Sequence, residues 1–301
     1  MNLKSLRVFT YVIEDATLAR AAARLNLSQS AASRLLTLLE EEFAVTLFRR
    51  DRKRLVPTAA AERFYPEAVR ILSQIAAIPA LFDEAHQDTR PPLRIICQTR
   101  IQNALVLPAM AALSAAQPHV PMKLEVRPRR DLGRLILTDQ YDVGISTLPL
   151  PVHGLQPQAL GAVRLSVLLP SRHPLAAKAS LSATDLAQMP YIALDRTTIV
   201  RQLADRTLAQ MNQALEITHE VSTGDAAYRL VREGLGFTFA DPVAVAPDLA
   251  ARTALVPWDA EAIVTYGYFV STQGQDHPAM PGFLKIVKAA VAAARAEPAG
   301  R

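Results

Sequence analysis

Several features that mark common classes of protein are scarce in this sequence of 301 residues. It has a single cysteine, Cys97, which excludes a disulfide within the chain and fits a reducing compartment. No run of about 18 uncharged apolar residues occurs, so we expect no membrane span. The first residues, MNLKSLRVFTYVIEDA, lack the apolar core and the cleavage site of a secretion signal. These absences predict a cytoplasmic protein.

Sequence patterns of enzymes and metal sites are missing as well. Walker A and GxSxG sequences do not occur, and Gly234 and Gly236 follow a helical stretch instead of opening one, so we interpret them as a helix stop. The histidines form no HxxxH or HExxH pair and lie at His86, His119, His153, His173, His219 and His277. We therefore expect no catalytic residue, no cofactor and no metal.

Positive charge is concentrated at one end of the chain. Met1–Thr58 contains ten Lys and Arg against six Asp and Glu, whereas the remainder of this chain of net charge +5 is nearly balanced. Half of all residues are hydrophobic, which is ordinary for a protein with a packed core. A basic end on a nearly neutral body indicates one DNA-contacting end rather than a protein that coats nucleic acid throughout.

A helix-turn-helix pattern occupies the basic end. Apolar spacing predicts a helix over Leu3–Glu14 and a second over Leu18–Leu25. Ser28 can accept a hydrogen bond from a free backbone N–H, so a third helix should run from Gln29 to about Glu42. Ala32, Leu36 and Leu39 share its apolar face, whereas Gln29, Ser33 and Thr37 form a polar line. Short hydrogen-bonding side chains suit base edges in the DNA major groove.

A strongly basic hairpin is predicted after the third helix. Five of the six positions Arg49–Arg54 carry a cation, and only Asp51 interrupts them. A hairpin wing with this charge would contact DNA phosphates or enter a minor groove.

These motifs together resemble the winged helix-turn-helix of the LysR-type transcriptional regulators. The resemblance rests on SQSAASRLLTLLEEEFAVTLFRR, which begins at Ser28, and on PTAAA, which begins at Pro57. It implies a transcriptional regulator that binds promoter DNA. With the polar line and the wing, the predicted DNA-binding residues are Gln29, Ser30, Ser33, Arg34, Thr37, Arg50, Arg52, Lys53 and Arg54. Ala44 stands where the family usually has glycine, which would cost about 1 kcal/mol if that residue is left-handed.

A long helix is predicted after the wing. Thr58 can cap it, and it carries too many apolar side chains for a helix standing in water, so a partner helix is expected. The resemblance implies that residues 59–90 form a linker helix that pairs in a dimer. Pro79 should bend or end the helix. The polar stretch HQDTRPP, from His86 to Pro92, suggests a domain boundary.

The remaining residues alternate short apolar strands with helices. This pattern predicts an α/β domain with a mostly parallel sheet over residues 91–301. A late strand, TYGYFVS, fits a two-lobed domain that resembles type 2 periplasmic binding proteins. In that interpretation lobe one comprises residues 92–161 and 266–301, and lobe two comprises residues 162–265. The whole chain is then α/β, with an all-α winged helix-turn-helix at residues 1–58.

Ligands of open α/β lobes bind beyond the carboxyl ends of the strands, where helix N-termini offer free N–H groups. Hydroxyl groups and arginines at these strand exits suit a carboxylate. The predicted effector-binding residues are Thr99, Arg100, Ile101, Arg129, Arg130, Ser146, Thr147, Thr197, Thr198, Ser222 and Thr223. Any of the hydroxyl groups can instead serve only as a helix cap, and Arg129 and Arg130 also fit a solvated surface.

The sequences VRPRRD and ALDRTTIVRQ resemble the family branch that includes opine and lysine-pathway regulators, which implies an effector that is an amino acid or another small organic acid. The resemblance also implies dimers that assemble into tetramers and bend promoter DNA, with RNA polymerase as a candidate partner. Two alternatives stay open at this point. One is a transport-type binding protein, which would need export, and the other is a DNA-binding protein whose second domain is a scaffold without ligand.

Overall fold

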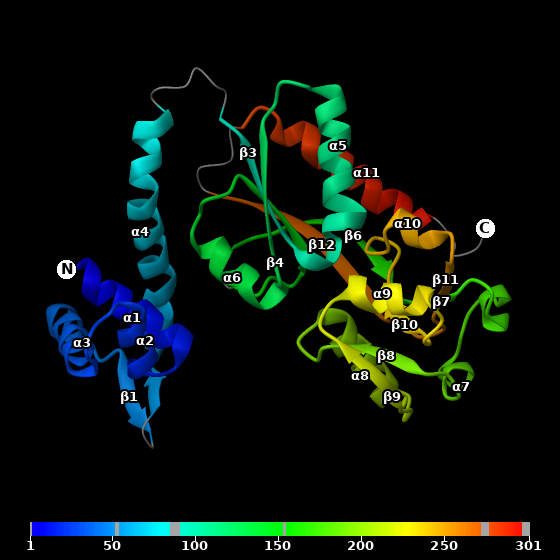
Figure 1. Cartoon of the computed structure of the whole chain (residues 1–301), viewed down its shortest axis with the longest axis horizontal. Coiled ribbons are helices and arrows are strands. Elements are labelled where there is room, and N and C mark those ends of the chain that lie inside the picture. The colour runs from blue at the N-terminus through cyan, green and yellow to red at the C-terminus, as the bar shows by residue number, and fades with distance from the viewer. Residues whose placement is uncertain (1, 52–53, 85–90, 153–154, 272–276, 297–301) are drawn as a thin grey trace. The chain divides into compact units, whose positions relative to one another are not determined.

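The computed structural model describes residues 2–51, 54–84, 91–152, 155–271 and 277–296 (Figure 1). The chain divides into two compact units. The first comprises Met1–Thr89 with Arg134–Gln140, and the second comprises Arg90–Gly133 with Tyr141–Arg301. The domain and lobe boundaries expected from the sequence stay predictions.

The first unit contains the predicted helices and the predicted hairpin. Its elements are α1 (Leu3–Asp15), α2 (Leu18–Arg24), α3 (Gln29–Phe43), β1 (Phe48–Asp51), β2 (Arg54–Pro57) and α4 (Ala59–Glu84). Their apolar faces meet in one core, in which the Phe9 ring packs against Phe48 and Phe64 at centroid distances of 5.8 and 5.0 Å. The expected helices and wing are therefore confirmed.

Local signals set the ends of α3 and α4. Ser28 Oγ accepts a hydrogen bond from Ala31 N at 3.1 Å, so the predicted cap of α3 is confirmed. Ala44, which follows α3, has φ 52° and is left-handed. Pro79 was expected to bend or end the long helix, and it does not end it, because α4 continues to Glu84. A proline removes one backbone hydrogen bond, and a helix of this length retains the bonds on both sides of it.

The second unit contains a five-stranded mixed sheet, which we call lobe one together with its helices. The strand order is β4-β3-β5-β12-β6. Strand β3 is parallel to β4 and β5, whereas β12 is antiparallel to both of its neighbours. The elements are β3 (Leu93–Gln98), η1 (Thr99–Ile101), η2 (Gln102–Val106), α5 (Leu107–Ala116), β4 (Met122–Arg127), α6 (Arg129–Leu137), β5 (Val143–Leu148), β6 (Gln158–Arg164), β12 (Ile263–Val270) and α11 (Met280–Ala296). The division between the units falls within α6, since Arg134–Gln140 belong to the first unit.

Lobe two consists of two smaller sheets and their helices. Strands β10-β7-β11 form an antiparallel sheet, and β8 and β9 form a parallel pair. The elements are β7 (Ser166–Pro170), η3 (Pro174–Ala177), α7 (Ala183–Leu186), β8 (Tyr191–Leu194), α8 (Ile199–Gln210), β9 (Ile217–Val221), α9 (Gly224–Arg232), β10 (Thr238–Ala240), α10 (Pro247–Ala250) and β11 (Thr253–Pro257). A mostly parallel sheet was expected, and this is wrong, because the returning strand β12 and the sheet around β7 are antiparallel.

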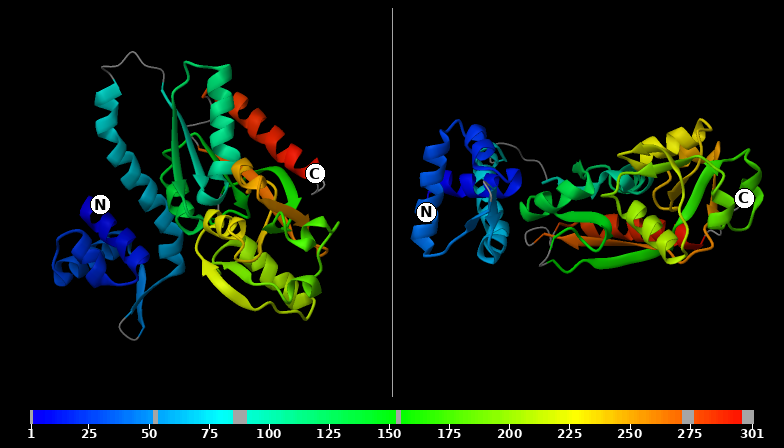
Figure 2. Two further views of the ribbon diagram at one scale, coloured as in Figure 1. Left: turned by 45° about the vertical axis from the view of Figure 1, so that its right-hand side comes forward. Right: turned by 90° about the horizontal axis from the view of Figure 1, so that it is seen from below.

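Two neighbouring chain segments connect the lobes (Figure 2). Strand β6 leads into β7 with only Leu165 between them, and β11 returns to β12 through residues 258–262. The backbone N–H of Leu165 donates to Ala262 O at 2.8 Å, and Arg164 pairs with Ile263. In lobe one, α5 and α11 pack against each other, and Val291 of α11 lies directly over Gly161 of β6. The carboxyl ends of β3, β8 and β9 thus belong to one body, in which a site between the lobes can form.

Candidate functional site

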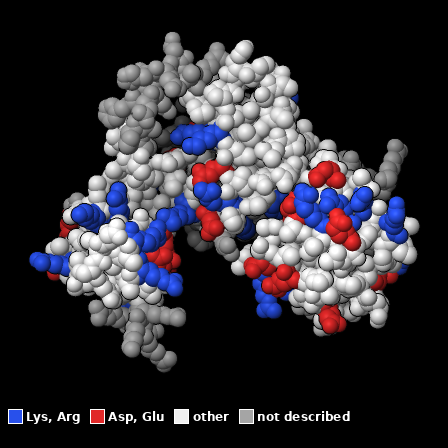
Figure 3. Space-filling model, viewed as in Figure 1, with Lys and Arg blue, Asp and Glu red and all other residues white. Residues whose placement is uncertain are grey.

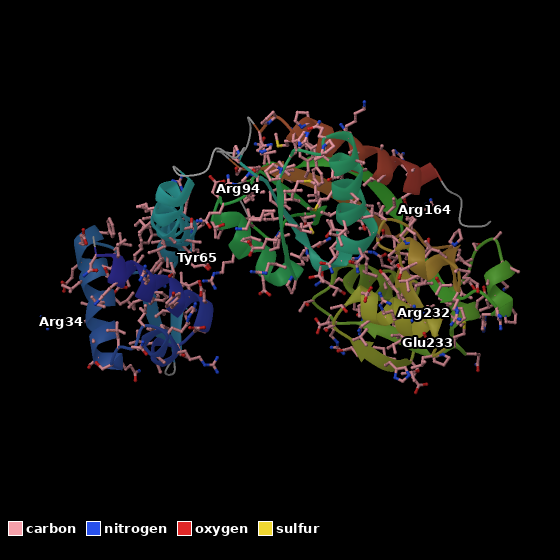
Figure 4. All side chains as sticks on the ribbon, turned by 45° about the horizontal axis from the view of Figure 1, so that its top comes forward. Arg34, Tyr65, Arg94, Arg164, Arg232 and Glu233 are labelled. Carbon is pink, nitrogen blue, oxygen red and sulfur yellow. The ribbon has the colours of Figure 1, made fainter. Side chains whose placement is uncertain are left out.

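Helix α3 presents a polar face opposite its buried stripe. Ala32, Leu36 and Leu39 are buried, as the spacing predicts. Of the predicted DNA-binding residues on this helix, Ser33 is half-buried and the exposed ones are Gln29, Ser30, Arg34 and Thr37. Arg34 projects outward from α3 (Figure 4). The helix therefore offers a line of hydrogen-bonding groups of a size that suits base edges.

The polar side chains on this face differ in whether they already make hydrogen bonds within the protein. Thr37 Oγ1 donates to Ser33 O at 3.2 Å, and Ser30 Oγ lies 3.0 Å from Ser28 Oγ. Gln29 and Arg34 have no side-chain hydrogen bond or ion pair to any other residue that the structure describes. Their donors and acceptors are free for an external partner.

Glu40 joins α3 to the wing. Its Oε1 accepts hydrogen bonds from Leu47 N at 2.7 Å and from Phe48 N at 3.1 Å. Phe48 is the first residue of β1, so one carboxylate on α3 fixes the start of the wing. We did not predict this role, although a glutamate one turn before the end of the helix is visible in the sequence.

The predicted hairpin is present as β1 and β2. Arg50 pairs with Leu55 and Asp51 with Arg54 across the two strands. The side chains of Arg50 and Arg54, and all of Arg52 and Lys53, lie outside the described residues. In the view of Figure 3, the first unit shows mainly Lys and Arg side chains with some acidic ones beside them, and acidic and basic side chains are interspersed over the second unit.

A cavity of about 150 Å³ lies between the lobes of the second unit. Both lobes contribute residues that follow the carboxyl ends of strands, as the sequence interpretation expects for a ligand site. The lining residues are Gln98, Thr99, Arg100, Pro128, Arg129, Leu194, Asp195, Thr197, Thr198, Ile199, Ser222, Thr223, Gly224 and Asp225. Seven of the predicted effector-binding residues are therefore brought together, namely Thr99, Arg100, Arg129, Thr197, Thr198, Ser222 and Thr223.

Four other predicted residues do not line this cavity. Ile101 is fully buried in the core. Ser146 and Thr147 are also fully buried, and Thr147 Oγ1 lies 3.3 Å from the side-chain amide of Gln98. The side chain of Arg130 lies outside the described residues. Thr147 therefore supports the cavity wall from behind, because Gln98 itself lines the cavity.

The N-termini of two helices meet the cavity from lobe two. Thr198 Oγ1 accepts from Arg201 N at 3.4 Å at the start of α8, and Thr223 Oγ1 accepts from Ala226 N at 3.3 Å at the start of α9. Both threonines are therefore caps as well as lining residues. One cap leaves other first-turn N–H groups of each helix without a partner in the helix. The first residues of the two helices, Ile199 and Gly224, line the same cavity.

Arg129 faces these helices from lobe one. Its guanidinium donates to two backbone carbonyls, Thr147 O at 3.1 Å and Pro149 O at 2.5 Å. Burial lowers the pKa of Arg129 below its ordinary value, and no neighbouring carboxylate among the described residues offsets this shift. Within the described part of the chain, no acidic side chain therefore balances the positive charge of Arg129.

Arg100 has a different environment. Its Nη1 donates to Tyr266 Oη and its Nη2 donates to Asp241 Oδ2. Burial acts against the charged guanidinium, but Asp241 outweighs it and raises the pKa of Arg100 well above its ordinary value. Burial also raises the pKa of Tyr266 well above its ordinary range. We did not predict Asp241 or Tyr266, because neither is close to Arg100 in the sequence.

The lining residues that the sequence did not predict are Gln98, Pro128, Leu194, Asp195, Ile199, Gly224 and Asp225. All of them are close in sequence to predicted residues. Their position at the end of a strand could have identified them, whereas their side-chain type could not. Within the described part of the chain, no group of three or more His, Cys, Asp or Glu residues could hold a metal ion. None of the helices described is long and apolar enough to cross a membrane.

Comparison with known proteins decides the family. Residues 3–62 match the bacterial regulatory helix-turn-helix protein family of lysR type, and residues 86–292 match the LysR substrate binding domain. The chain belongs to the LysR family. This LysR-family protein is accordingly a transcriptional regulator with a DNA-binding helix-turn-helix and an effector-binding domain.

Relatives of this LysR-family regulator match most of its length. The uncharacterized HTH-type transcriptional regulator YeiE of Escherichia coli K12 is 28% identical over 253 residues, which cover 84% of this chain and 85% of YeiE. The regulatory protein NocR of Agrobacterium fabrum is 29% identical over 243 residues, which cover 79% of this chain and 80% of NocR. A variant of full-length OxyR from Pseudomonas aeruginosa shares the fold, with a TM-score of 0.57, 22% identity and coverage of 96% and 95% of the two chains.

Proposed function

We propose that this LysR-family regulator is controlled by a small carboxylate that binds in the cavity between the two lobes. The observation that carries the proposal is the convergence of two helix N-termini and Arg129 on one cavity. An anion is favoured at a helix N-terminus by free N–H groups and by the helix dipole. The Arg129 guanidinium adds a charge that no described acidic side chain matches.

The size of the cavity limits the ligand. A protein cavity of about 150 Å³ can hold a molecule as large as benzene, and this cavity has a volume of about 150 Å³. A free amino acid or a short organic acid is close to that size. This agrees with the ligand class that the sequence implied.

We propose that DNA is read by α3 and held by the wing. Gln29 is the first candidate for base recognition because its amide is exposed and has no other described partner. Ser30, Ser33, Arg34 and Thr37 extend the same face. The wing cations Arg50, Arg52, Lys53 and Arg54 would contribute to affinity through phosphates, which carry no sequence information.

We propose self-association through α4, first as a dimer and then as a tetramer. Ile78 on this helix is 47% exposed, and Ile71, Leu72 and Ile75 are only half-buried. Pairing with a second copy of the helix would remove this apolar surface from water. Because its partner is promoter DNA, we place the protein in the cytoplasm, and RNA polymerase is a further candidate partner. We propose no catalytic role.

A ligand screen tests the proposed effector class. Amino acids, opines and short dicarboxylates would be added to the wild type, and the melting temperature would be measured. We expect short carboxylates to raise it, and we expect Arg129→Gln to reduce the shift. Val152→Ala, in lobe one outside the cavity lining, serves as a control that keeps the shift. A screen in which only apolar aromatic molecules raise the melting temperature would reject the carboxylate, and the absence of any saturable calorimetric titration would favour a scaffold without ligand.

The coupling between ligand and DNA can be tested separately. A ligand shifts an equilibrium only by its difference in affinity for the two states. We therefore expect a ligand that binds the cavity to change the DNase footprint on operator DNA. Identical footprints with and without every ligand that binds would contradict control by an effector.

A further inference from the structure

Arg100 lines the effector cavity, yet its charge is already matched inside the protein. The side chain is 11% exposed, and the Asp241 carboxylate that pairs with it is completely buried. Asp241 Oδ1 also accepts from Tyr266 Oη at 2.8 Å and from Val243 N at 3.0 Å. The carboxylate thus has an internal partner for both of its oxygens and is not available to a ligand.

The pair joins the two lobes through Arg100, which lines the cavity. Arg100 follows β3 of lobe one, whereas Asp241 follows β10 of lobe two. Tyr266 lies on β12, the strand that returns from lobe two to lobe one. A buried ion pair of this kind is strongly perturbed when one partner is removed, because the other charge is left uncompensated.

Two buried polar atoms near this pair, Arg100 Nε and the Tyr228 hydroxyl oxygen, make no hydrogen bond of good geometry to any residue that the structure describes. The two side chains are neighbours, since burial raises the pKa of Tyr228 to about 12 and the Arg100 guanidinium opposes this rise. Tyr228 lies beneath the first turn of α9, since a Cβ built on Gly224 would be 3.1 Å from its hydroxyl oxygen. Gly224 and Arg100 both line the cavity. Where Arg100 lines the cavity, its positive charge is thus already balanced by Asp241.

We propose that Asp241 determines effector specificity by acting as a built-in carboxylate on Arg100. The effector then carries one carboxylate, held by Arg129 and the helix N-termini, and presents a neutral hydrogen-bonding group such as an amide or hydroxyl toward Arg100. The inference rests on the proposed function, because it assumes that a carboxylate binds in this cavity.

The physical reason is repulsion between like charges in a poorly solvated site. A second ligand carboxylate near Arg100 would lie close to the Asp241 carboxylate, and two such groups cannot both remain ionised without cost. A neutral acceptor avoids this cost and can still accept a hydrogen bond from the part of Arg100 that lines the cavity.

Succinate and its monoamide succinamate form a suitable pair of probes, because they have the same shape and differ in one charge. Their dissociation constants would be measured by calorimetry with the full-length wild type, with Asp241→Asn and with the control Asp142→Asn. Asp142 is also a buried aspartate paired with an arginine, Arg94, but it does not line or support the cavity. We expect the wild type and the control to prefer succinamate by at least about tenfold. We expect Asp241→Asn to reverse the preference.

The outcomes separate the inference from the proposed function. Equal or tighter binding of succinate by the wild type would overturn the role of Asp241 and leave the carboxylate site intact. Failure of all short monocarboxylates to bind the wild type would instead reject the proposed effector class.

A second measurement does not depend on the effector. In Asp241→Ala the vacated space beside Arg100 should accept formate. Added formate is therefore expected to raise the melting temperature of this variant more than that of the wild type or of Asp142→Ala. Equal shifts in all three proteins would show that Arg100 is not a carboxylate site and would overturn the inference.

Discussion

The side of α3 that we propose to face DNA and the cavity between the lobes both contain polar residues, but in opposite environments. Gln29 and Arg34 are exposed and have no described partner, so their function is separate from the stability of the fold. Arg100 and Asp241 are buried and bonded to each other, so ligand recognition there is tied to the packing of two lobes. We therefore expect single substitutions on α3 to change the preferred DNA sequence. A change of ligand preference at Arg100 would require a matching change at Asp241.

The largest expected effect is loss of the buried charge pair. Asp241→Ala leaves Arg100 buried without a counter-ion, which should lower the free energy of unfolding by about 3–5 kcal/mol. Urea denaturation of the full chain would measure it. The double variant Arg100→Gln with Asp241→Asn should be less destabilised than Asp241→Ala, because no charge is left unpaired. If Asp241→Ala lowered the free energy of unfolding by less than about 1 kcal/mol, water would be solvating the Arg100 guanidinium in place of the carboxylate.

Loss of the contact between α3 and the wing should have the next largest effect on stability. Glu40→Ala removes an acceptor from two backbone N–H groups, and we expect a loss of about 2–3 kcal/mol in the stability of the first unit. DNA affinity should fall for every sequence alike because the wing is no longer fixed. Glu40→Gln keeps an oxygen acceptor and is the matched control. If both variants behaved as the wild type in denaturation and in DNA binding, Glu40 would not hold the wing.

Substitutions on the predicted DNA-binding surface should change DNA binding without changing the free energy of unfolding. Gln29→Ala is expected to lose about 1–3 kcal/mol of discrimination between operator and unrelated DNA. Its unfolding free energy should change by no more than about 0.5 kcal/mol. Arg52→Ala should weaken binding to all sequences and reduce the slope of log K against log salt by about 0.9. Fluorescence anisotropy at several salt concentrations would measure both variants, and a changed sequence preference in Arg52→Ala alone would contradict the division of roles.

The smallest expected effect concerns the end of α3. Ala44 is left-handed with φ 52°, a conformation that glycine adopts at no steric cost. Ala44→Gly should therefore raise stability by about 1 kcal/mol. Ala23→Gly, at an exposed position inside α2, should lower it by about 0.5–1 kcal/mol. Thermal denaturation of the two variants would show shifts of opposite sign, and a destabilised Ala44→Gly would contradict the strain.

Short-range signals made the first unit predictable. The cap at Ser28 and the apolar spacing of α3 depend on residues within one or two turns, and both are confirmed. In the second unit, strand exits identified the region of the cavity but not which side chains face it. Ser146 and Thr147 were expected to follow a strand, but they lie within β5 and are buried in the sheet.

Long-range pairs could not be predicted from the sequence. Arg100 and Asp241 are 141 positions apart, and only the folded lobes bring them together. Strand β6 was also missed, because its buried positions do not alternate and it contains Gly161. Its partner β12 was expected, but the antiparallel pairing between them depends on the return of the chain from lobe two.

The most direct test of sequence-specific regulation is a gel shift with the DNA that flanks the gene of this protein, in the presence of excess unrelated DNA. The wild type should retard this fragment, and Gln29→Ala should not, although it folds normally. Failure of the wild type to retard the fragment, or equal retardation by Gln29→Ala, would contradict the account of α3 as the helix that reads this DNA.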